Sequence, residues 1–199
     1  MLKRSLLALL ALLLVGSGPG YAIRYVPRHF ASCEAAASVA GAHPTVGLYQ
    51  YRLSAHFVDA AVRRVAGLGY RGTGRIRYGF APGSTVMLLP QWTWPNMTRS
   101  QRDAMVRFLS TLRNHEAGHT EIAQRGIGGR ESNITVLAKS APDAKKQMQL
   151  ALSDQLRALY DEVLETQKTY DRVTDHGISQ SEGPQYKFRG GDDVVFSCR

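Results

Sequence analysis

The chain has few cysteines, and their placement does not resemble a cysteine metal site. Its 199 residues include two, Cys33 and Cys198, and neither belongs to a C-x-x-C pair. Cysteine zinc ligands usually occur in such pairs, so thiolate ligation of zinc is disfavoured. In an exported protein, two isolated cysteines favour one disulfide, which would join the start of the domain to its end. We therefore predict a disulfide between Cys33 and Cys198.

Long hydrophobic runs are also absent beyond the first residues. Lys3 and Arg4 precede an apolar run at 6–15, which is shorter than the roughly 20 residues that span a bilayer as a helix. Gly20-Tyr21-Ala22 then supplies the small residues of a signal-peptidase site. We predict that residues 1–22 are a signal peptide and that the protein is exported, either to the periplasm or as a secreted protein. No permanent membrane span is expected.

Acidic residues are outnumbered, because 16 Asp and Glu stand against 25 Lys and Arg. Removing the predicted signal peptide takes away two basic residues and no acidic one, so the formal charge falls from +9 to +7. This charge is compatible with an anionic envelope surface as a partner. We expect no nucleic-acid binding, because the chain lacks a recognised nucleic-acid motif and is predicted to be exported. The sequence contains no repeat, and residues 23–199 are long enough for a single domain with its own core.

Apolar periodicity and turn residues give a coarse assignment of secondary structure. Residues 23–44 have the composition of an irregular segment, with one or two helical turns at 34–40. We expect strands at 45–55, 75–80 and 84–89 (the last ended by Pro90), a helix at 56–68, an aromatic loop at 91–95 and further helix at 130–140. Two long helices are expected, one beginning at a Thr98-x-x-Gln101 capping box and one at 143–171.

The most informative pattern is His115-Glu116-Ala117-Gly118-His119, an H-E-x-x-H motif. On a helix the two imidazoles share one face and can bind one zinc ion. The apolar stripe of the first long helix includes Phe108 and Leu112, and it continues by threes and fours through both histidines. We therefore predict that His115 and His119 point inward, toward the wall of a core or cleft.

A catalytic zinc ion usually has three protein ligands and one open position for water. Glu116 is suited to act as the general base, because it is ionised at neutral pH and can pass a proton from water to a leaving amine. Ile122 and Arg125 occupy the positions of the common H-x-x-G-x-x-H extension, so the third ligand lies elsewhere in the sequence.

His176 is the favoured third ligand from its setting. It follows the second long helix in a turn bounded by glycine, and Asp171, Thr174 and Asp175 lie near enough in sequence to orient its ring. The alternatives left open by the sequence are Asp175, Glu131, Glu162 and Glu165. His29, His43 and His56 stand alone in sequence, and we interpret them as surface or ordinary packing residues.

Three segments together resemble the DUF922 family, a group of predicted secreted zinc-dependent proteases of bacteria in the zincin-like clan. They are Leu89-Pro90-Gln91-Trp92, the His115–His119 motif, and 170–180, which is similar to Y-D-x-x-T-x-H-G-x-x-Q. The resemblance implies an α+β, zincin-like fold, with a small, mostly antiparallel sheet packed on two long helices, one of which carries H-E-x-x-H. It also implies that His176 completes the zinc site with His115 and His119.

The resemblance suggests further roles near the site. In zincins the substrate often lies along an exposed strand edge, which would here be Ser84–Leu89. Trp92 or Trp94 would then line the cleft, or would pack beneath the helices. Tyr170 would donate a hydrogen bond to the oxyanion of the reaction, or would be a core residue at the helix end.

The function expected from the sequence is therefore an exported zinc metallopeptidase that cleaves a peptide or protein substrate. Its cofactor would be Zn2+, and Glu116 would be its base. The alternative is a secreted, zinc-containing binding module of the cell envelope without peptidase activity. Zinc content with no hydrolysis of peptides would distinguish the second class from the first.

Overall fold

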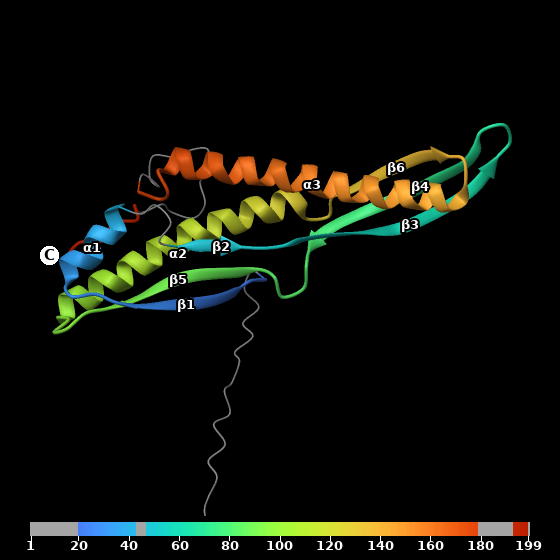
Figure 1. Cartoon of the computed structure of the whole chain (residues 1–199). Coiled ribbons are helices and arrows are strands. Elements are labelled where there is room, and N and C mark those ends of the chain that lie inside the picture. The colour runs from blue at the N-terminus through green and yellow to red at the C-terminus, as the bar shows by residue number, and fades with distance from the viewer. Residues whose placement is uncertain (1–19, 43–46, 179–192, 199) are drawn as a thin grey trace, which may run out of the picture.

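The computed structural model describes residues 20–42, 47–178 and 193–198, so nearly all of the predicted signal peptide and His43 lie outside the described residues. Within these ranges the chain forms an elongated structure of three helices and two small sheets (Figure 1). The elements in chain order are β1 (Ala22–His29), α1 (Cys33–Ala42), β2 (Leu48–Gln50), β3 (Leu53–Val65), β4 (Gly69–Phe80), β5 (Val86–Thr93), α2 (Arg99–Ile127), β6 (Glu131–Ala138) and α3 (Ala141–Thr174).

Each sheet contains three strands, and the two sheets occupy different parts of the molecule (Figure 1). In the first sheet β5 lies between β1 and β2, with β1 parallel and β2 antiparallel to it. The second sheet is antiparallel, with β4 between β3 and β6. The predicted α+β class with two long helices is confirmed. The expectation of one small sheet was wrong, because the segment 81–85 carries the chain from one sheet to the other.

The two long helices, α2 and α3, pack against each other (Figure 1). At the start of α2 the Thr98 side chain accepts a hydrogen bond from the Gln101 N–H, and the Gln101 side chain accepts one from the Thr98 N–H. This is the predicted capping box. Ser140 caps α3 through the N–H of Asp143, and Pro142 lies in the first turn, where its missing N–H costs nothing. Both predicted long helices are confirmed.

The predicted helix at 56–68 was wrong, since most of these residues form β3. The apolar residues of this segment have helical spacing, but β3 pairs with β4 from Leu53 opposite Phe80 to Val65 opposite Gly69. A bulge between Phe57 and Asp59 shifts the register. Such a shift breaks the two-residue alternation that would have marked a strand. The pairing with a strand further along the chain therefore decided the structure.

Three smaller predictions were also wrong. Residues 130–140 are mainly β6 rather than helix, consistent with the β-branched residues at 134–136. Residues 23–44 are not irregular, because they contain β1 and α1, although the helical turns at 34–40 are confirmed. Pro90 does not end β5, which continues to Thr93. Since β2 pairs only as far as Leu88, Pro90 has a neighbouring strand on one side alone, where a missing N–H is tolerated.

The described residues form two hydrophobic cores. The first core joins α1, β5 and the first half of α2 around Trp92, Phe108 and Phe196. The predicted Cys33–Cys198 disulfide is present, and it holds the segment that carries Phe196 against this core. The second core lies between α3, the end of α2 and the β3-β4-β6 sheet. No helix among the described residues is long and apolar enough to cross a membrane.

Candidate metal centre

The H-E-x-x-H motif lies in the middle of α2, between the two cores. His115, Glu116 and His119 are all buried, although each is polar. On the same helix Leu112 belongs to the first core and Ala123 to the second. Both histidines therefore point inward, as the apolar stripe predicted. This direction brings their rings against the end of α3.

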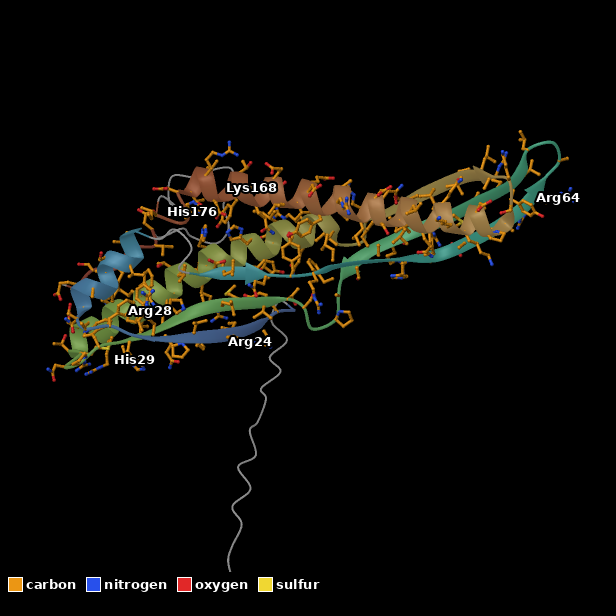
Figure 2. All side chains as sticks on the ribbon, in the orientation of Figure 1. Arg24, Arg28, His29, Arg64, Lys168 and His176 are labelled. Atoms are coloured by element: carbon orange, nitrogen blue, oxygen red, sulfur yellow. A yellow bond between two sulfur atoms is a disulfide. The ribbon has the colours of Figure 1, made fainter. Side chains whose placement is uncertain are left out.

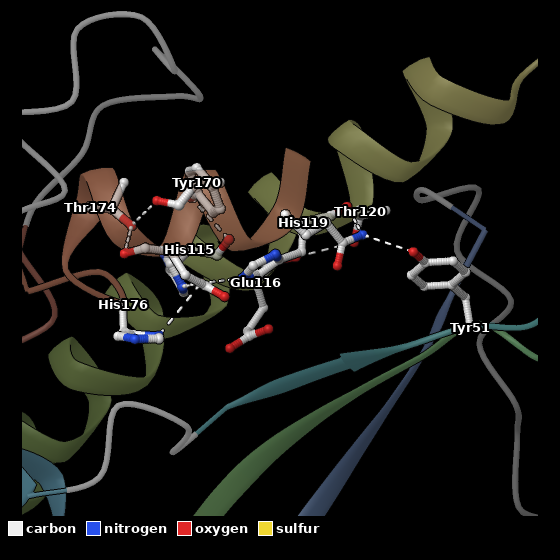
Figure 3. A network of polar contacts seen from close by, with 10 residues as sticks. Tyr51, His115, Glu116, His119, Thr120, Tyr170, Thr174 and His176 are labelled. Atoms are coloured by element: carbon white, nitrogen blue, oxygen red, sulfur yellow. Dashed lines mark hydrogen bonds and ion pairs between the residues drawn. The ribbon is translucent and has the colours of Figure 1, made fainter. Parts of the chain in front are cut away.

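The end of α3 places a carboxylate between the two histidines. The Oδ1 atom of Asp171 lies 2.9 Å from Nε2 of His119 and 3.3 Å from Nε2 of His115. Figure 3 shows His115 and His119 close together, with His176 below them. Burial alone would raise the pKa of Asp171, but hydrogen bonds from His115 and His119 outweigh it and hold this pKa below its usual range. The carboxylate is therefore ionised and faces two imidazole nitrogens.

The spacing of these three donor atoms fits a small divalent cation. A tetrahedral zinc ion with ligands at about 2.1 Å separates neighbouring donors by about 3.4 Å. The two Nε2 atoms lie close to this separation from Asp171 Oδ1, and all three donor atoms lie within 4.8 Å of one another. The Nδ1 atom of His119 is buried without a hydrogen-bond partner among the described residues. This nitrogen is not the one that faces Asp171, so the fit to a cation rests on the two Nε2 atoms and the Asp171 carboxylate.

Glu116 extends from α2 toward β2 (Figure 3). Its carboxylate accepts a hydrogen bond from the backbone N–H of Tyr49, and Gly47 lies so close that any side chain there would overlap Glu116. Burial raises the pKa of Glu116 despite the opposing effect of His119 and His115. The raised pKa makes this carboxylate a stronger proton acceptor than an exposed glutamate.

His176, the predicted third ligand, lies in the turn that follows α3. Its Nδ1 atom is 3.8 Å from Asp171 Oδ1, and its side chain is about one-third exposed. Asp175 and His176 have positive φ angles of 45° and 52°, and Gly177 follows with 94°. A side chain on Gly177 would press against the ring of His115, so the glycine allows this turn to close over the histidine. The structure thus brings His176 beside the group, next to Asp171.

The other predicted alternatives lie in different surroundings. Glu131 pairs with Arg75 and Arg77 on the second sheet. Glu162 and Glu165 form surface ion pairs with Arg130 and Lys168. Asp175 is the exposed C-cap of α3. None of these four belongs to the group of metal-capable side chains found among the described residues.

Tyr170 is a packing residue in this structure. It is fully buried, its ring stacks on His115 at 4.9 Å, and its hydroxyl donates to the backbone carbonyl of His115 at 3.2 Å. Gly118 leaves room for that hydroxyl, because any side chain there would overlap it. This position corresponds to the core role predicted for Tyr170 rather than to an oxyanion donor. Tyr170 therefore fixes the distance between α2 and α3 at the centre.

The roles suggested for the strand and the tryptophans are corrected by the fold. Trp92 and Trp94 are both buried in the first core, where Trp92 stacks on Phe108. The strand at 84–89 belongs to β5, which is the central strand of its sheet. The strand edge beside Glu116 belongs instead to β2, which lies within the strand predicted at 45–55.

Asp171 is the site residue that sequence reasoning assigned to a lesser role, as a neighbour of His176. A signal for it was present in the sequence. The inward side of α3 runs through Val163, Gln167, Tyr170 and Thr174. Continuing from Gln167 by four residues reaches Asp171, which would have placed its carboxylate on the face that meets α2.

Comparison with known families agrees with the motifs. Residues 82–177 match the family described as "Bacterial protein of unknown function (DUF922)", and this range includes the L-P-Q-W segment, the H-E-x-x-H motif, Asp171 and His176. No curated protein and no solved structure matches the chain. This match supports the assignment of residues 82–177 to the DUF922 family.

Proposed function

We propose that this protein is an exported zinc-dependent metalloendopeptidase with its centre between α2 and α3. The observation that carries the proposal is the convergence of His115, His119 and Asp171 on one point, with a buried glutamate in the adjacent position. Imidazole and carboxylate donors suit zinc. A zinc ion held there would supply a Lewis acid, which acidifies water and polarises a peptide carbonyl.

Glu116 would act as the general base. Glu116 directly follows His115 on α2. Its raised pKa favours uptake of a proton from the attacking water. It would then return this proton to the leaving amine. The N–H of Tyr49 holds the carboxylate toward β2, so this backbone group positions the base.

The third ligand comes from the end of α3, where two side chains compete. The distances support Asp171, and the resemblance to the family supports His176. A catalytic zinc site keeps one position open, so only one of the two is expected to bind. Zinc content distinguishes them in the variants Asp171→Asn and His176→Asn. Loss of a ligand should abolish stoichiometric zinc, whereas loss of an orienting neighbour should weaken affinity by about 10–100-fold.

The peptidase proposal is tested with Glu116→Gln, which keeps the shape of the side chain but cannot accept the proton. Cleavage of casein and of a peptide library should fall by about 10²–10⁴-fold in kcat/KM, because a positioned base contributes on this scale. The zinc content should remain that of the wild type. Glu121→Gln is the matched control, since Glu121 lies on the same helix in a surface ion pair with Arg125.

Two outcomes would contradict the proposal. Equal cleavage by wild type and Glu116→Gln would remove Glu116 from the chemistry. Stoichiometric zinc without cleavage of any peptide would favour the zinc-containing binding module instead. The burial of Glu116 against Gly47 is the observation that makes this second result worth testing.

A further inference from the structure

The end of the molecule farthest from the candidate centre is a separate surface feature. The turn between β3 and β4 meets the end of β6 and the start of α3 there (Figure 1). We call residues 63–71 and 137–146 the arm tip. Tyr70 pairs with Arg64 on one side and Ala138 on the other, which ties the three strands together. Figure 2 shows Arg64 at this end and His176 toward the opposite end.

The arm tip concentrates positive charge. It contains six basic residues and one acidic residue, Asp143, a net charge of +5 within a chain whose formal charge is +9. The carboxylate of Asp143 accepts a hydrogen bond from the Ser140 hydroxyl at 2.6 Å, so it is engaged at the start of α3. The six basic side chains are all exposed, and none forms an ion pair with a described residue; they are Arg63, Arg64, Arg71, Lys139, Lys145 and Lys146.

Basic residues nearer the middle of the same sheet, unlike those of the arm tip, form ion pairs with acidic side chains. Arg75 pairs with Asp59 at 2.7 Å, and Arg77 pairs with Glu131 at 2.8 Å. At the tip, Arg63 lies directly opposite Arg71, with no acidic residue in that row. Like charges directly opposite on neighbouring strands destabilise a sheet. An anionic surface outside the molecule would relieve this repulsion.

Apolar side chains accompany the charge. Leu68 lies in the turn at the apex and is 56% exposed, and Leu137 is 50% exposed beside Arg71 in the same cross-strand row. Exposed leucine surrounded by Lys and Arg is typical of surfaces that enter the boundary between lipid headgroups and acyl chains. A soluble anionic polymer or a nucleic acid offers the charge but no apolar layer for Leu68.

We propose that the arm tip docks on the surface of an anionic phospholipid bilayer. Arg63, Arg71 and the lysines at the start of α3 contact the lipid phosphates, and Leu68 enters the headgroup boundary. Docking by the tip keeps the candidate metal centre away from the lipid, because the centre lies between the two cores and outside the tip. The proposal does not depend on zinc binding or on peptidase activity.

The test is sedimentation of residues 23–199 with vesicles of phosphatidylcholine alone and of phosphatidylcholine with phosphatidylglycerol. Binding should require the anionic lipid and should weaken as salt increases. In Arg63→Gln/Arg71→Gln, affinity should fall about 25-fold, because each basic side chain near an anionic bilayer contributes about fivefold. Leu68→Ser should also weaken binding while leaving its salt dependence in place.

Arg24→Gln/Arg107→Gln is the matched control, since it removes two exposed arginines outside the tip. It should bind within about twofold of the wild type. Equal loss in the control would mean that total charge alone drives binding. Binding that survives the tip substitutions, or that is absent from anionic vesicles but present with soluble polyphosphate, would overturn the proposal. Thermal unfolding of each variant excludes misfolding as the cause of a loss.

Discussion

The two ends of this molecule are stabilised by different means. The disulfide end relies on large aromatic side chains, including Trp92, Phe108 and Phe196, and on a covalent link between α1 and the C-terminal segment. The opposite end, which carries the arm tip, relies on the long β-hairpin of β3 and β4, which is covered by α3. There Gly72 and Gly74 lie so close to Met148 that side chains at either position would press on it. The disulfide end is stabilised by the packing of large side chains. The opposite end is stabilised by the close approach of the β4 backbone to α3.

The candidate centre lies where these two differently stabilised regions meet. Helix α2 passes through both cores, and His115–His119 occupies the stretch between them. The first core fixes one end of this stretch, and the second core fixes the other. A metal centre needs donor groups held within a fraction of an ångström. Support from two independently packed regions supplies that precision.

The largest expected effect on stability comes from the first core. Phe108→Ala should lower the free energy of unfolding by about 3–5 kcal/mol, because it removes a buried ring that contacts Trp92 and Phe196. Chemical denaturation measures this change. Val106→Ala on the same helix is the control, since Val106 is 66% exposed, and it should stay within about 0.5 kcal/mol. Similar losses in both variants would contradict the assignment of this core.

Loss of the disulfide should destabilise the two ends of the molecule to different extents. Cys33→Ser/Cys198→Ser should lower the free energy of unfolding by about 2–5 kcal/mol, as removal of a native disulfide commonly does. Amide hydrogen exchange should accelerate more in α1 and β1 than in β3 and β4, because only the former lie at the linked end. Uniform acceleration throughout the chain would show that the two ends unfold as one unit. Wild-type protein with reductant is the control.

Glycine substitutions test the packing of α2 against α3 at the candidate centre. Gly118→Ala should destabilise the protein by about 1–3 kcal/mol, because the new methyl group would overlap the Tyr170 hydroxyl and push α2 and α3 apart. Gly41→Ala in α1 meets no atom within 4 Å and should instead stabilise by up to about 1 kcal/mol. Thermal unfolding compares the two. If both variants became more stable, the packing at the centre would be looser than described.

The smallest expected effect is a pH dependence of stability caused by Asp171 at the candidate centre. Because the folded state lowers the pKa of Asp171, its contribution to stability is present above about pH 4 and is lost as the pH falls through the lowered value. In metal-free protein this loss should amount to about 1 kcal/mol. Asp171→Asn should lack it, whereas Asp161→Asn, an exposed substitution on the same helix, should retain it. Parallel curves for all three proteins would contradict the contacts of Asp171 with the histidines.

Much of this organisation was readable from the sequence where the signal is local. The Thr98 capping box, the stripe through Phe108 and His115, and the two isolated cysteines each depend on near neighbours or on simple chemistry. The pattern at 56–68 led to a wrong prediction of helix. These residues form a strand because they pair with β4, and a bulge breaks the alternation of side chains between the two faces of the sheet. Asp171 was underrated for a related reason, since its role depends on how α3 packs on α2.

Zinc content tests the central claim most directly, namely that α2 and α3 hold a zinc ion between them. After dialysis against trace zinc, the wild-type protein should retain one zinc ion per chain, and His119→Asn should retain none. His29→Asn, which changes an exposed histidine on β1, should bind zinc as the wild type does. Absence of zinc from the wild type, or equal zinc in His119→Asn, would contradict the account.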